Sequence, residues 1–81
     1  MPITPEEAEA HAKKAITQYI ADCKLTDSEQ IGDVLMKLLS VTGVVLAQAV
    51  GGEDAAARIY GVAVFIQETM PAGPAKLVPI Q

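Results

Sequence analysis

The two side chains with the most reactive chemistry in this sequence are a single histidine, His11, and a single cysteine, Cys23. A histidine that works as a general acid or base needs a pocket and a partner group, whereas His11 falls on the polar side of a helical pattern, beside Glu7 and Lys14. A reactive thiolate needs a helix N-terminus or a basic cluster, and Cys23 has neither. We therefore expect a solvated histidine and a small core cysteine, with an intermolecular contact as the alternative for the thiol.

The carboxylates that stand close together in the sequence form two groups, each in the first turn of a predicted helix. They are Glu6, Glu7 and Glu9 in the first group and Glu53 and Asp54 in the second. The positive end of the helix dipole already explains negative charge at these places, and acidic charge after the double glycine would repel a phosphate there. We expect no enzyme, no cofactor and no metal site, and we assign these five residues to a face that binds a partner with a basic surface.

The balance of charge argues against nucleic acid as the partner. Six Lys and Arg against ten Asp and Glu leave a net charge of −4, whereas duplex binding draws most of its affinity from neutralised phosphates. Between residues 27 and 70 only Lys37 and Arg58 are basic. A helix-turn-helix repressor needs more such residues on its recognition helix, so we expect no nucleic-acid binding.

Neither a targeting segment nor a membrane span is expected. The first residues have no positive segment followed by an apolar one. The longest uncharged run covers residues 38–52, which is shorter than the roughly 20 apolar residues of a membrane span. We interpret this run as a buried core helix and expect a cytoplasmic protein.

The first element that must position these residues is a helix over residues 4–23. Thr4 and Glu7 form the capping-box pattern T-x-x-E, and Pro5 suits the first helical position. Apolar residues recur at steps of three and four along this segment, and most of those in its first half are alanines. The larger side chains that should anchor it are Ile16, Tyr19 and Ile20.

The second element is a helix over residues 27–50, with a second T-x-x-E pattern at Thr26–Glu29 and a stop at the double glycine. After Lys37 it is apolar on nearly all sides, which is typical of a central helix or an interface. Its valine-rich part also fits a strand, which the uninterrupted helical spacing disfavours.

The third element is a helix over residues 53–70 that ends before Pro71. If this helix folds back on the second one, Gly43 faces Tyr60 and Gly61, and two matched glycines indicate a close approach of the backbones. A tolerated glycine at either position is the alternative.

The fold class is therefore all-α: a small three-helix bundle over residues 1–70, made of an antiparallel helical hairpin and an N-terminal helix. An extended, proline-rich tail follows over residues 71–81. Its apolar residues are Leu77, Val78 and Ile80. We expect them to pack weakly on the bundle or on a second subunit, with a frayed terminus as the alternative.

The last two helices carry more apolar side chains than one neighbouring helix covers. A chain of this length buries only about 60% of its unfolded surface, so self-association is the natural source of further stability. We expect a homodimer or a higher oligomer. The expected interface residues are Val44, Leu46, Val62, Phe65 and Ile66.

These observations favour a non-enzymatic protein–protein interaction module: a regulator, an inhibitor or an assembly factor. Short, acidic, alanine-rich helical chains are common among phage and mobile-element accessory proteins, but this is a likeness of composition and not of a motif. The alternative is a small-ligand carrier with an apolar pocket between helices, lined by Leu39, Tyr60 and Phe65.

Overall fold

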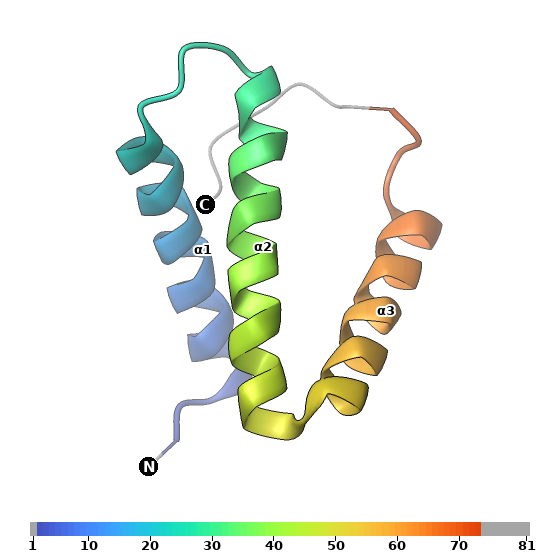
Figure 1. Cartoon of the computed structure of the whole chain (residues 1–81). Coiled ribbons are helices and arrows are strands. Elements are labelled where there is room, and N and C mark those ends of the chain that lie inside the picture. Colours follow the sequence, from blue (N-terminus) through green and yellow to red (C-terminus); the bar gives the residue numbers. More distant parts are fainter. Residues whose placement is uncertain (1, 74–81) are drawn as a thin grey trace. The chain divides into compact units, whose positions relative to one another are not determined.

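A computed structural model describes residues 2–73 of the chain, and these form three helices (Figure 1). The helices are α1 (Pro5–Cys23), α2 (Glu29–Val50) and α3 (Gly52–Thr69). Within the described part of the chain 82% of the residues are helical and there is no strand. The predicted all-α class of a small helical bundle is confirmed, and the strand alternative for the valine-rich part of α2 is wrong. The predicted packing of the apolar tail residues lies outside the described residues.

The described residues form two compact units, and the division between them falls inside α2. Unit 1 extends to Val34 and contains α1, the connection that follows it and the first turns of α2. Unit 2 begins at Leu35 and contains the rest of α2 and all of α3. All five predicted interface residues therefore belong to unit 2.

Helix α1 begins with the predicted capping box. The Glu7 backbone N–H donates to the Thr4 hydroxyl oxygen at 3.1 Å, and the Thr4 N–H donates to the Glu7 carboxylate at 2.9 Å. These bonds satisfy two donors that have no partner inside the helix. The bond from the Thr4 backbone, followed by that with its side chain, lowers the pKa of Glu7 below its ordinary value. The helix ends at Cys23, because Lys24 takes a left-handed conformation with φ 52°.

The predicted capping box at the start of α2 is wrong by one residue. The box forms between Asp27 and Gln30, whose backbone N–H groups each donate to the other's side chain, at 3.4 and 3.3 Å. The Asp27 carboxylate also accepts a bond of 2.9 Å from the Glu29 N–H, and the Gln30 side chain accepts one of 2.8 Å from the Thr26 N–H. Because Asp27 caps the helix, α2 begins at Glu29 rather than at residue 27.

Unit 1 is held together by a few half-buried side chains from α1 and the start of α2. The α1 residues expected to anchor it are all half-buried, and so are the last residues of the unit; they are Ile16, Tyr19, Ile20, Ile31 and Val34. The Tyr19 hydroxyl donates a hydrogen bond of 2.8 Å to the Val34 carbonyl. This bond joins α1 to the first turns of α2.

In unit 2, α2 and α3 are joined at Gly51, as the sequence predicts (Figure 1). Gly51 has a φ of +94°, which a residue with a Cβ rarely adopts. Ala55, in the first turn of α3, is the one buried residue among residues 2–73, at 2% exposure. Helix α3 ends at Thr69, one residue before the predicted end, because Met70 is extended ahead of Pro71.

Of the two glycines expected at a close approach, only Gly43 stands at one. A Cβ at Gly43 would lie 3.3 Å from the Ile59 Cδ1 atom, whereas a Cβ at Gly61 would meet nothing within 4 Å. The prediction is therefore confirmed for Gly43, with Ile59 as the neighbour rather than Tyr60, and it is wrong for Gly61.

Candidate interaction surface

The most prominent feature of unit 2 is the number of large apolar side chains that solvent reaches. Ten of the eleven exposed large hydrophobic residues belong to this unit. They are Met36, Leu39, Val41, Val44, Val45, Tyr60, Val62, Phe65, Ile66 and Met70. Large contiguous apolar areas are rare on soluble monomers and mark interaction sites. We refer to these ten residues as the apolar surface.

Part of the apolar surface continues the two rows of side chains that face each other near the turn. On α2 the row that contains Gly43 continues to Leu39 and Met36, and on α3 the row that contains Ile59 continues to Ile66 and Met70, at helical steps of three, four and seven. Val62 lies at the edge of the α3 row. We call the exposed members the inner stripe: Met36, Leu39, Val62, Ile66 and Met70.

The rest of the apolar surface faces other directions, and we call it the outer surface. It consists of Val41, Val44 and Val45 on α2 and of Tyr60 and Phe65 on α3. Tyr60 is the most exposed of the ten, at 72%. Both helices thus present apolar side chains beyond the faces they turn toward each other.

The structure places four of the five predicted interface residues on this apolar surface. Val44, Val62, Phe65 and Ile66 are each more than half exposed. Leu46 is half-buried, because it lies one turn beyond Gly43 on the same side of α2, close to the turn. Sequence reasoning did not assign Met36, Leu39 and Met70 to an interface, although their spacing from Gly43 and Ile59 carries the necessary signal.

The three residues expected to line a ligand pocket are exposed. Leu39 is 47% exposed, and Tyr60 and Phe65 are 72% and 64% exposed. Side chains that line an enclosed ligand site are mostly covered. The arrangement of these residues therefore favours contact with another surface over enclosure of a small molecule.

The predicted acidic face is divided between the two units. In unit 1, Glu9 forms an exposed ion pair of 3.6 Å with Lys13, and Glu7 belongs to the capping box. In unit 2, Asp54 pairs with Arg58 at 3.3 Å. Exposed pairs of this kind within one helix contribute about 0.3–0.5 kcal/mol, so these carboxylates stay available to a basic partner.

The two residues with reactive side chains lie on α1, apart from the apolar surface. His11 is exposed, and Cys23 is a half-buried free thiol. Burial raises the pKa of the Tyr19 hydroxyl above its ordinary value, and Cys23 adds to this effect. No group of three or more metal-ligating side chains occurs within residues 2–73.

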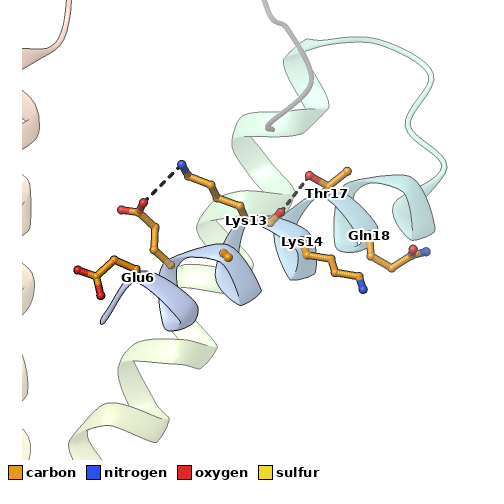
Figure 2. A pocket seen from close by; sticks show the side chains of 7 residues that line it. Glu6, Lys13, Lys14, Thr17 and Gln18 are labelled. Carbon is orange, nitrogen blue, oxygen red and sulfur yellow. Dashed lines mark hydrogen bonds and ion pairs between the residues drawn. The ribbon is translucent and has the colours of Figure 1, made fainter. Parts of the chain in front are cut away.

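A shallow hollow on α1 is the clearest concavity on unit 1 (Figure 2). Its lining residues all come from one helix: Glu6, Glu9, Ala10, Lys13, Lys14, Thr17 and Gln18. The Thr17 hydroxyl donates to the Lys13 carbonyl at 3.0 Å, and Lys13 pairs with Glu9. Since the polar groups bond within their own helix and no second element closes the hollow, it offers a ligand little beyond the surface of a solvated helix.

By length and composition, α2 is also the one helix among the described residues that is long and apolar enough to cross a membrane. None of its 22 residues is buried. The chain matches no protein-family model, and no curated protein sequence and no solved structure matches it significantly. A functional conclusion therefore depends on the residues of this chain.

Proposed function

We propose that the protein is a non-enzymatic protein–protein interaction module that works as a homo-oligomer, in the manner of a small regulator, inhibitor or assembly factor. The observation that carries the proposal is the apolar surface of unit 2, in a chain whose described residues bury only Ala55. An apolar surface of this extent is stabilised when another surface covers it.

The size of the apolar surface supports this proposal. With roughly half of a side chain's area of about 200 Å² exposed in each case, the ten residues present on the order of 1,000 Å² of apolar area. A specific protein interface covers about 800 Å² on each partner. Unit 2 therefore has enough apolar area for one stable interface, and the outer surface leaves room for a second contact.

The acidic groups at the starts of α1 and α3 would serve a different purpose. Charge at the rim of an interface raises the rate of encounter and selects the partner more than it adds to affinity. With a net charge of −4, the protein attracts a basic surface. We propose that Glu6, Glu7, Glu9, Glu53 and Asp54 orient such a partner.

A membrane is the other environment that would cover α2, and the charges in the helix argue against it. Lys37 lies near the middle of α2, with Asp33 one turn before it, and both side chains are exposed. A charged side chain at the centre of a bilayer costs about 2.5–3.5 kcal/mol. A protein interface leaves both charges in water, which favours a protein as the occupant of this surface.

The carrier alternative has weaker support, because the residues expected to line its pocket are exposed. Native mass spectrometry tests it directly: a small molecule that stays bound to the purified chain would favour a carrier over an interaction module.

Sedimentation equilibrium at micromolar concentrations tests the main proposal. We expect a mass of at least twice 8.5 kDa. A stable monomer over the whole concentration range would refute self-association. For the partner, capture experiments should compare the native chain with a Glu53→Lys/Asp54→Lys variant, and a specific partner with a basic surface should be lost on charge reversal.

A further inference from the structure

The two helices of unit 2 are in contact at the end near the Gly51 turn. Ala55 is buried there, and the Ile59 Cδ1 atom would lie 3.3 Å from a Cβ placed on Gly43. The absence of a side chain at Gly43 thus lets α3 come close to α2. No further side chain fits between the helices at this end.

Farther from the turn, the same two rows of side chains are uncovered. Met36 and Met70 are each 59% exposed, Ile66 is 51% exposed and Leu39 is 47% exposed. Because these residues continue the rows that contain Gly43 and Ile59, they are the side chains a closed hairpin would bury against each other. Unit 2 therefore has one covered end and one uncovered end along a single apolar stripe.

The inner stripe contains no charged residue. In the α2 part of unit 2 the one charged residue is Lys37, which lies on another side of the helix from Leu39 and Gly43. On α3, Arg58 is the charged residue next to the stripe, one turn before Val62, and it pairs with Asp54 on its own helix at 3.3 Å. Two stripes of this kind can meet without bringing like charges together, whereas a strongly basic partner would gain nothing from them.

We propose that a second copy of this chain covers the inner stripe, so that α2 and α3 of two subunits form a four-helix core. This inference rests on the proposed self-association and adds the surface that carries it. A twofold arrangement is self-complementary, and the uncharged stripe meets that requirement. Its five side chains present roughly 500 Å² on each copy, or about 1,000 Å² in a pair, which is the least that a specific interface buries.

The outer surface then stays free in the dimer, although it is as apolar as the inner stripe. This distinction makes the proposal testable with matched variants. Ile66 in the inner stripe and Val44 on the outer surface are both aliphatic, helical and exposed, at 51% and 60%. Glutamine at either position keeps the helix and leaves no polar group buried in the monomer.

The test measures the dimer dissociation constant of the full chain by sedimentation equilibrium for the native protein, Ile66→Gln and Val44→Gln. We expect Ile66→Gln to weaken the dimer at least about tenfold, which is typical of a truncated residue at the centre of an interface, and Val44→Gln to change it less than about twofold. Circular dichroism confirms that both variants keep the helix content of the native chain.

Cross-linking gives a second measurement that does not depend on a loss of stability. In a Cys23→Ser background, Ile66→Cys and Val44→Cys each leave one thiol per chain. A short bis-maleimide should link Ile66→Cys chains into covalent dimers and leave Val44→Cys chains largely single.

The outcomes separate this inference from the proposed function. A native chain that stays monomeric overturns both, and it shows that a different protein covers the stripe if it covers one at all. A native dimer that Val44→Gln weakens and Ile66→Gln does not, with cross-links at position 44, overturns the inference and leaves the proposed function standing. Equal weakening by both variants also overturns it, because the interface would then not be the inner stripe.

Discussion

Replacing Gly61 with alanine is expected to stabilise the protein, whereas the same change at Gly43 is expected to bring little or nothing. Both glycines lie inside helices, where alanine is favoured by about 1 kcal/mol. At Gly61 the new methyl group meets nothing within 4 Å, so the full gain should appear. At Gly43 it would lie 3.3 Å from the Ile59 Cδ1 atom, and Ile59 must move by a few tenths of an ångström.

The cost of that movement sets the size of the difference. Turning a side chain about 30° away from its preferred rotamer costs about 0.5–1.5 kcal/mol, which offsets most or all of the gain at Gly43. Ile59→Val removes the Cδ1 atom and restores the space. We therefore expect a favourable coupling of about 0.5–1 kcal/mol between Gly43→Ala and Ile59→Val in a double-mutant cycle.

The assay is urea denaturation followed by circular dichroism, with all variants at one protein concentration, because association adds to the apparent stability. The free energy of unfolding is compared for Gly61→Ala, Gly43→Ala, Ile59→Val and the double variant. If Gly43→Ala stabilises the protein as much as Gly61→Ala, or if the coupling with Ile59→Val is zero, the close approach at Gly43 is refuted.

Three further predictions concern unit 1. Thr4→Ala should lower the free energy of unfolding by about 0.5–2 kcal/mol through loss of the cap, measured by the same denaturation and contradicted by an unchanged midpoint. The pKa of Glu7 is lowered in the folded state, so its contribution is full above its ordinary value of 4.5 and is lost as the pH falls through the folded value; Glu7→Gln should flatten the acid side of the stability profile. Tyr19→Phe should cost about 1 kcal/mol by removing the bond to the Val34 carbonyl, and equal unfolding midpoints would show that this bond contributes nothing.

The helix starts show how far local sequence signals carry. The capping box at Thr4 is predicted correctly, because no other capping residue competes with it in the adjacent positions. At the start of α2, Thr26–Glu29 and Asp27–Gln30 both fit the pattern, and Asp and Thr are both good caps. The pattern alone does not decide between two boxes one residue apart, and the structure selects Asp27.

The contact between α2 and α3 depends on the turn, which sequence reasoning places correctly but does not resolve in detail. Gly43 is predicted at a close approach, yet its neighbour is Ile59 and not Tyr60. A shift of one residue turns a helix by about 100°, so a small error in the turn moves a different side chain into contact. For the same reason Gly61, two positions after Ile59, faces open space.

The candidate surface is predictable as a quantity and less so as a pattern. The excess of apolar residues after Lys37 predicts uncovered area, and four of the five residues assigned to it are exposed. Leu46 is half-buried because its side of α2 is covered near the turn. Which part of an apolar helix stays uncovered depends on where its neighbour comes close, and periodicity does not contain that information.

The covered and uncovered ends of unit 2 link stability to association. Ala55, the one buried residue among residues 2–73, has a small side chain and supplies little apolar area. A native domain needs about 5–15 kcal/mol of net stability, and each large apolar side chain contributes about 1.5–3 kcal/mol on full burial. The largest reserve of such burial in unit 2 is the apolar surface, which another chain must cover. Folding and binding then form one equilibrium, in which the Gly43 contact fixes one end of the hairpin and the partner completes the core at the other.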